Sequence, residues 1–392
     1  MIQGVVEAAN VEAVVEDLRK VRYTVTDVKE QADVFASLRA WRQRLVKVNL
    51  WAIVVFTRQF ATIFNSGVPL LRGLEGLSKQ TLNARLSTAL AEVYVDVKNG
   101  MSMARALQKH PDVFTPVYIA LVRAGEMAGA LGEILDRTAG FLERDYQLRK
   151  RVQAATSYPI FVFFVTILVT GILVLWVFPT FVSLLDGLNV ALPWPTRLLI
   201  FITNVVYNPL FIIAAPLSLG FGIVSLNRWM KTRLGRRVID RLLLELPVIG
   251  SINKKVVISR FCRTLATLVQ SGVPLVHALE IVSKVTGNEI VSDILDEVKR
   301  GVKTGMKMSQ PLREYILFPP IVSHMVSVGE ETGNLADILT KLANFYDSEV
   351  EASLDAFSSL IEPIMISFMG AVVGFVLLAV FLPVYQILQN FS

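Results

Sequence analysis

Three long stretches of the chain contain no charged residue, and they alternate with polar segments. The stretches are residues 152–185, 198–227 and 363–392, and each has at least 30 residues. A helix needs roughly 20 predominantly apolar residues to cross a bilayer, whereas a buried core helix seldom has more than about 14 in a row. We therefore predict transmembrane helices at 158–182, 198–227 and 363–388, rather than buried core helices.

The two polar segments, 51–157 and 228–362, show the pattern of helices. Apolar residues recur in both with the spacing i, i+4, i+7, i+8, at Phe56, Phe60, Ile63 and Phe64 and again at Phe261, Leu265, Leu268 and Val269. This spacing places them on one helix face, and neither segment has the alternation of a half-buried strand. We predict an all-α membrane protein with two tandem bundles of about six helices each.

The two polar segments are copies of one unit. Residues 60–75 and 265–280 are identical at nine of sixteen positions, including a shared Ser-Gly-Val-Pro-Leu, at an offset of 205. The Gly-Glu-x-x-Gly at 125–129 recurs at 329–333 with an offset of 204. The prolines at 159 and 179 recur at 363 and 383 with the same offset, so the repeat includes a transmembrane helix.

Glycines and prolines that occur at equivalent positions in both copies predict where the turns between helices lie. Glycine tolerates the left-handed conformation that ends many helices, and a proline shortly after it cannot continue the helix. Asn83 and Thr115-Pro116 are typical helix starts, and a last helix is expected to begin near Ala130 and continue through Arg151 into the membrane. The predicted structural turn residues are Gly67, Pro69, Gly125, Gly129, Gly272, Pro274, Gly329 and Gly333.

The distribution of basic residues predicts the topology. Lysines and arginines flank the first stretch on its N-terminal side and the second on its C-terminal side, and such residues stay cytoplasmic. The N-terminus is then inside, segment 186–197 outside, 228–362 inside and the C-terminus outside. Because the two copies are expected on the same side of the membrane, their transmembrane helices cross it in the same direction. The chain must then cross back once between the copies, and the middle stretch, 198–227, supplies this crossing.

The first 50 residues differ from both copies. A helix face at Val11, Val14, Val15 and Leu18 is flanked by segments rich in β-branched residues, followed by a basic linker. We predict a small α/β N-terminal cap and linker.

Composition narrows the class of protein. The chain is 53% hydrophobic and only 18% charged, whereas soluble proteins average about 45–50% and about 25%. The formal net charge is +6, but the basic residues gather beside the apolar stretches. This placement favours anionic membrane lipids as partners and argues against nucleic acid.

Residues that could support catalysis are few. The sequence has no phosphate-binding Gly-x-x-x-x-Gly-Lys-Ser/Thr loop and no Gly-x-Ser-x-Gly. His110, His277 and His324 are scattered, and the single cysteine, Cys262, excludes an intramolecular disulfide and a cysteine-based metal cluster. We predict no catalytic, metal or cofactor-binding residue, and no enzymatic activity.

Two motifs have a structural and a functional interpretation. Glu126 and Glu330 are either solvated residues of a helix-ending turn or contacts for a partner protein. Gly370 and Gly374, spaced as Gly-x-x-x-Gly, are candidate helix-packing residues, because small residues let membrane helices approach closely. The second motif predicts a homo-oligomer.

Residues 51–388 resemble one known family, the type II secretion F and type IV pilus C inner-membrane platform proteins. The resemblance rests on the duplicated Ser-Gly-Val-Pro-Leu and Gly-Glu-x-x-Gly-x-Leu, on Tyr158-Pro159 and on Ile361-Glu362-Pro363. It implies a multi-pass protein of the bacterial inner membrane that couples a hexameric ATPase to pilin or pseudopilin assembly, beside other inner-membrane assembly proteins. Whether the machine is a pilus or a secretion system stays open.

Two rival functions remain. A small transporter built from a duplicated unit would account for the repeat and for the Asn- and Pro-interrupted middle stretch, although no span has an ionisable residue at its centre. A membrane-anchored signalling protein or enzyme would need a catalytic set that the sequence does not have.

Overall fold

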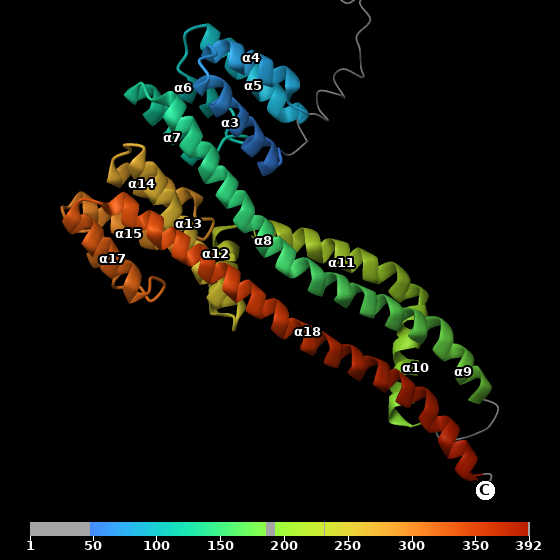
Figure 1. The fold of residues 1–392 in the computed structure, drawn as a ribbon. Coiled ribbons are helices and arrows are strands. Elements are labelled where there is room, and N and C mark those ends of the chain that lie inside the picture. The colour runs from blue at the N-terminus through green and yellow to red at the C-terminus, as the bar shows by residue number, and fades with distance from the viewer. Residues whose placement is uncertain (1–47, 186–192, 231, 391–392) are drawn as a thin grey trace, which may run out of the picture.

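The predicted all-α fold is confirmed. The computed structural model describes residues 48–185, 193–230 and 232–390, and within these ranges every regular element is a helix. Figure 1 shows two helical bundles at one end of the molecule and long helices that run away from them. The predicted N-terminal cap lies, up to residue 47, outside the described residues.

The first bundle has the expected six helices. Its core consists mainly of residues from α3 to α7, such as Phe56, Phe60, Leu90 and Leu107, each at most 2% exposed. The helices are α3 (Leu50–Asn65), α4 (Leu70–Gln80), α5 (Ala84–Lys98), α6 (Met103–Gln108), α7 (Pro116–Ala128) and α8 (Leu131–Ile172).

The second bundle repeats this order and adds one helix, α12, at its start. Its core includes Phe261, Leu265, Leu295 and Leu339, which are fully buried. The helices are α12 (Arg233–Glu245), α13 (Ile249–Gln270), α14 (Leu275–Val285), α15 (Glu289–Lys303), α16 (Ser309–Leu312), α17 (Pro320–Thr332) and α18 (Leu335–Asn390).

The turns predicted at Gly67 and Gly272 have the expected backbone. Gly67 and Gly272 have φ values of 87° and 80°, and each follows the last residues of its helix. Asn83 caps α5 by accepting a hydrogen bond from the Leu86 backbone N–H, and the Thr115 hydroxyl does the same for Tyr118. Local sequence therefore fixes where these helices begin and end.

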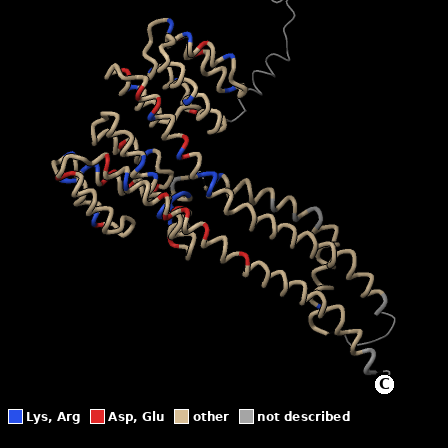
Figure 2. The backbone as a smooth tube through the Cα atoms, viewed as in Figure 1, with Lys and Arg blue, Asp and Glu red and all other residues tan. Residues whose placement is uncertain are grey.

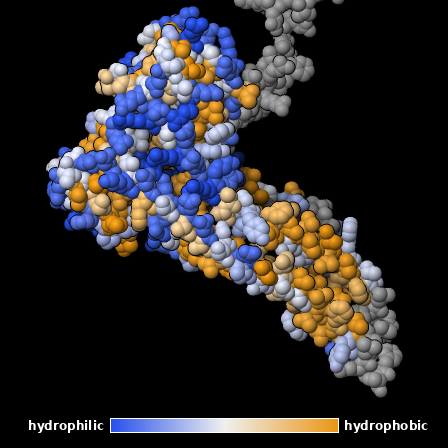
Figure 3. Space-filling view, in the orientation of Figure 1, coloured by the Kyte–Doolittle hydropathy of each residue, from blue (hydrophilic) through white to orange (hydrophobic). Residues whose placement is uncertain are grey.

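Three helices are long and apolar enough to cross a membrane, namely Leu131–Ser183, Pro209–Met230 and Leu335–Gln386. The first joins α8 to a π-helical segment, η1 (Leu173–Val177), and to α9 (Phe178–Leu185). Figure 3 shows that hydrophobic surface covers the end formed by these helices, while the surface of the bundles is mixed and mainly hydrophilic. Exposed apolar surface of this extent indicates contact with lipid.

The middle span differs from the single helix predicted at 198–227. The chain forms α10 (Trp194–Tyr207) and α11 (Pro209–Met230), separated by an extended Asn208. Pro209 has no N–H to donate and disfavours a helical Asn208. The Asn208 side chain caps the second helix by accepting from the Leu210 N–H. The candidate span therefore begins at residue 209.

Candidate coupling interface

Two long helices, α8 and α18, connect the bundles to the apolar region. Each follows a glycine in the left-handed region, with φ of 64° at Gly129 and 69° at Gly333. Each then runs without interruption into residues predicted to cross the membrane, as expected for the helix near Ala130. At 1.5 Å per residue α8 is roughly 60 Å long. The two helices are in contact and run side by side (Figure 1).

One ion pair, present in both bundles, holds the bundle onto its long helix. Arg58 on α3 forms two hydrogen bonds with Glu143 on α8, with Nε–Oε1 at 2.7 Å and Nη2–Oε2 at 2.8 Å. At the equivalent positions of the second bundle, Arg263 on α13 forms an ion pair with Asp347 on α18, here through a single hydrogen bond. Arg58 corresponds to Arg263 at the offset of 205, and Glu143 to Asp347 at 204. The duplicated sequence thus encodes a duplicated clamp.

The electrostatics of this clamp follow from its geometry. The hydrogen bond from Arg58 lowers the pKa of the Glu143 carboxyl, and partial burial opposes this only in part. The same contact raises the pKa of Arg58. Both groups therefore stay ionised near neutral pH, and the contact persists as a charge-assisted pair.

The two long helices are also tied to each other. Arg151 on α8 forms an ion pair with Glu351 on α18, close to a small apolar cluster that contains Leu148 and Val350. Figure 2 shows charged residues concentrated in the bundles and sparse along the distal parts of α8 and α18. The polar contacts between the helices therefore end near the point where the apolar segments begin.

The bundles also contact each other directly. Val117, Leu121 and Ile134 of the first bundle belong to the apolar cluster of the second. The Arg137 guanidinium donates to the Gln270 carbonyl oxygen at 2.5 Å. The first bundle is thus not independent of the second.

A cavity of about 130 Å³ remains between the bundles, lined by residues of α8, α13 and α14 among others. Arg260 lies in it with its Nε buried and without a hydrogen-bond partner, and the nearest carboxylate oxygen, on Asp145, is 3.6 Å away. Burial lowers the pKa of Arg260. An incompletely paired buried cation costs free energy, so this is a weak part of the contact between the bundles.

Glu126 and Glu330 have the same structural contact. Each carboxylate accepts hydrogen bonds from the first backbone N–H groups of the short helix before it, α6 or α16. Glu126 accepts from Met103 and Ala104, and Glu330 accepts from the N–H groups of Met308 and Ser309. A carboxylate at a helix N-terminus satisfies unpaired donors and interacts favourably with the helix dipole.

The predicted role of these glutamates in partner contact stays a prediction. Glu126 also lines a surface hollow together with Arg105 and Arg123, so its surroundings remain accessible to another molecule. The carboxylate itself already has two intramolecular donors, which favours the structural interpretation.

Gly125 on α7 and Gly329 on α17 lie where these helices pack against the start of the long helix that follows, α8 or α18. A Cβ on Gly125 would be 3.0 Å from the Ile134 Cβ, and one on Gly329 would be 3.3 Å from the Ile338 Cβ. The prediction that Gly125 and Gly329 are turn residues is therefore wrong: both lie inside helices, α7 and α17, where the absence of a side chain permits close helix approach. Gly129 and Gly333 form the turn, as predicted. In the Gly-Glu-x-x-Gly motif, the first glycine is thus needed for close packing of two helices and the second for the left-handed turn.

In the described part of the apolar region, α10 forms a compact contact with its neighbours. α10 packs against η1 and α18, where the Thr196 hydroxyl donates to the Ala379 carbonyl at 2.6 Å and the Tyr207 hydroxyl donates to the Leu175 carbonyl at 2.7 Å. Gly370 and Gly374 take no part in such packing, since a Cβ on either would meet nothing within 4 Å. Their predicted role in self-association stays a prediction.

Catalytic geometry is not assembled among the described residues. No group of three His, Cys, Asp or Glu side chains in the described ranges could hold a metal ion. Cys262 is buried, and burial raises the pKa of its thiol, which makes it unreactive. The functional geometry that the sequence missed, the Arg58–Glu143 and Arg263–Asp347 clamps, could have been found by aligning the two copies and searching for complementary charges.

Comparison with known proteins agrees with this architecture. The family model for protein F of the type II secretion system matches the chain twice, at residues 56–179 and 261–383. The chain is 40% identical over 345 residues to the type IV pilus assembly protein PilC of Thermus thermophilus, covering 87% of this chain and 83% of that protein. It is 30% identical to the type II secretion system protein F of Pseudomonas aeruginosa, covering 99% of this chain and 95% of that protein. Two copies of the family domain, each ending in a long apolar helix, place this chain in the type II secretion system protein F family, to which the pilus assembly protein PilC is also related.

Proposed function

We propose that this protein is the inner-membrane platform that couples a cytoplasmic hexameric ATPase to the assembly of pilin or pseudopilin subunits. The observation that carries the proposal is the continuity of α8 and α18, each clamped to its bundle and extending into the apolar region. A displacement of either bundle would be passed along a stiff helix into the membrane. The named relatives belong to pilus and secretion machinery, which supports this role.

The proposed orientation places both bundles in the cytoplasm and the C-terminal end of α18 outside. The ATPase would then contact the bundles, while pilin or pseudopilin would approach the apolar helices from within the bilayer. Of the relatives compared, a pilus protein shares higher identity than the secretion protein, 40% against 30%. We therefore propose to test the pilus ATPase first.

The test separates ATPase binding from coupling. Full-length protein in detergent should retain the hexameric ATPase, and it should hydrolyse no ATP without it. Insertion of two glycines after the exposed Gln153 of α8 interrupts the helix between bundle and membrane. This variant should still bind the ATPase but lose pilus or pseudopilus assembly, whereas Gln153→Ala should retain both. Failure of the wild-type protein to bind the ATPase would contradict the proposal.

A transporter remains the second candidate, because the break at Asn208 resembles the interrupted helices of transporters. The described spans, however, have no ionisable residue at their centres, and Asn208 satisfies the local backbone with its own side chain. Ion or solute flux into liposomes that contain the purified protein alone would favour transport.

A further inference from the structure

Helix α12, the helix of the second bundle that has no counterpart in the first bundle, has an exposed apolar stripe. Leu234, Val238 and Leu242 occur at i, i+4 and i+8 and are 74%, 55% and 56% exposed. Residues with this spacing lie along one face of the helix. Three large aliphatic side chains in line on a mainly polar bundle indicate a contact with an apolar partner.

The opposite side of α12 is fixed to the second bundle. Leu244 enters the bundle core and is 6% exposed, and Asp240 accepts a hydrogen bond at 2.8 Å from the Glu289 N–H at the start of α15. Arg237 forms an ion pair with Asp293 at 2.5 Å. These contacts orient the helix, so the apolar stripe must face away from the bundle.

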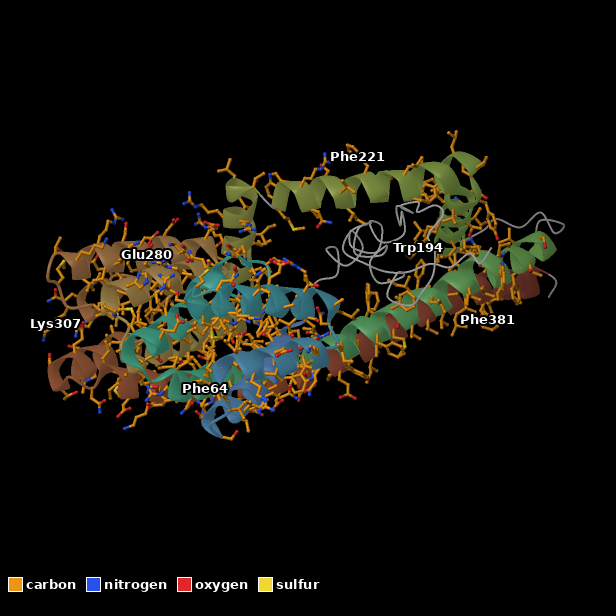
Figure 4. All side chains as sticks on the ribbon, turned by 90° about the horizontal axis from the view of Figure 1, so that it is seen from above. Phe64, Trp194, Phe221, Glu280, Lys307 and Phe381 are labelled. Atoms are coloured by element: carbon orange, nitrogen blue, oxygen red, sulfur yellow. The ribbon has the colours of Figure 1, made fainter. Side chains whose placement is uncertain are left out.

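The position of α12 in the fold identifies what the stripe faces. The helix follows α11 directly, and Figures 1 and 4 show it lying crosswise to α11 and α18, where the bundles meet the long apolar helices. A helix in this position, with the bundle on one side, has the membrane surface on the other. The turn from α11 is tight, because a Cβ on Gly235 would be 2.1 Å from the Trp229 carbonyl oxygen.

The charges along α12 complement an anionic surface. Arg236, Arg237 and Arg241 are more than half exposed. Arg241 pairs with Glu245 and Arg237 with Asp293, but a guanidinium has five N–H donors and can bind a phosphate as well. Amphipathic helices that are basic on the polar side and aliphatic on the other lie in the headgroup layer of membranes.

We propose that α12 is a lipid-binding helix, with Leu234, Val238 and Leu242 inserted at the acyl boundary and Arg241, beside the stripe, bound to the phosphates of anionic phospholipids. The inference requires that α11 crosses the membrane, and it does not depend on the ATPase. A second copy of the chain is the less suitable occupant, because three side chains fall far short of the roughly 800 Å² per partner of a stable interface.

The depth of the stripe can be measured with a fluorophore on single cysteines in the full-length protein, reconstituted at one copy per nanodisc. The native Cys262 is buried and does not interfere. A bimane at Val238→Cys should be quenched by lipids that carry a spin label near the headgroup. The matched control is Ile316→Cys, which is 97% exposed on the same bundle and should not be quenched. Absence of quenching at position 238 would overturn the proposal.

The same measurement distinguishes a protein partner from lipid. Position 238 is compared in nanodiscs that contain one copy and two copies of the protein. If it becomes shielded from both lipid and aqueous quenchers only in discs with two copies, the stripe is an interface between copies and the lipid proposal is wrong. Quenching by lipid that is equal in discs with one and two copies supports it. Neither outcome requires the ATPase or pilin, so failure here leaves the proposed function intact.

The contribution of the arginine charge to lipid binding is tested by comparing how strongly the protein binds phosphatidylglycerol and phosphatidylcholine. For each spin-labelled lipid, the fraction that the protein immobilises is measured. Arg241→Gln should reduce the preference for phosphatidylglycerol by up to about fivefold, the effect of one basic residue near an anionic surface. Lys79→Gln is the control, since Lys79 forms a comparable exposed pair with Glu75 on α4 of the other bundle. An equal effect of both substitutions, or of neither, would contradict a specific role of α12.

Discussion

Arg58 and Glu143 join α3 to α8 through two hydrogen bonds of 2.7 and 2.8 Å. The pair spans 85 residues of sequence and recurs as Arg263 and Asp347 in the second bundle. Two copies that diverged at most other positions have retained one charge pair across the same two helices. The first bundle and its long helix therefore behave as one unit.

Acid should loosen this contact. Arg58 lowers the pKa of Glu143 in the folded state, so the pair contributes stability above the ordinary carboxyl pKa of about 4.3. That contribution is lost as the pH falls through the lower, folded pKa. Hydrogen exchange of α3 in the full-length protein should be constant from pH 7 to about 5, after correction for intrinsic rates, and accelerate only below about 4.

Glu143→Gln should remove part of this acid dependence and accelerate α3 exchange already at neutral pH. Glu133→Gln, an exposed residue paired with Arg137 on the same helix, is the matched control and should change α3 little. An acid transition of unchanged size in the Glu143 variant would show that another group is responsible.

The structural role of Glu330 gives a second prediction. Glu330→Gln should weaken the cap on α16, cost about 1 kcal/mol locally, and accelerate exchange of the Met308 and Ser309 amides. Glu331→Gln removes the adjacent carboxylate, which pairs with Lys307 instead, and should leave these amides unchanged.

Binding of the ATPase, measured with the same two variants, tests the alternative role. If Glu330→Gln weakens ATPase binding while exchange at α16 and protein abundance stay normal, Glu330 is a partner contact rather than a cap. Loss of binding that accompanies faster exchange would reflect the cap.

Gly125 gives a third prediction, because its neighbour leaves no room for a side chain. In Gly125→Ala the new methyl group would be 3.0 Å from the Ile134 Cβ and 3.2 Å from the Leu131 Cα. Such overpacking costs about 1–3 kcal/mol and should lower the thermal stability of the first bundle. Gly76→Ala, on α4 with nothing within 4 Å, should be neutral or slightly stabilising. Equal melting curves would disprove close packing at Gly125.

The proposed topology gives a fourth prediction. A cysteine at Leu82 or Ile316, both almost fully exposed in the bundles, should react with a membrane-impermeant maleimide only after the cells are opened. A cysteine at Tyr385, near the far end of α18, should react in intact cells. Labelling of Tyr385→Cys only from the cytoplasmic side would contradict the parallel arrangement of the two copies.

Features encoded locally could be predicted from the sequence, and features encoded by distant contacts could not. Gly67 and Thr115 act on their immediate neighbours, so the turn and the cap follow from residue type alone. Glu126 finds its donors 22 and 23 residues away, and no periodicity reveals that partner. Pro209 signals the break at Asn208, but the long uncharged stretch around it favours one continuous span.

The lengths of α8 and α18 have a mechanical consequence. A helix of roughly 60 Å is a lever arm, and a tilt of about 5° at the bundle would move its far end sideways by roughly 5 Å. That distance is close to the pitch of one helical turn, about 5.4 Å. Adjustments too small to disturb the packing of either bundle would thus be magnified, at the opposite side of the bilayer, into steps as large as one turn of a neighbouring helix.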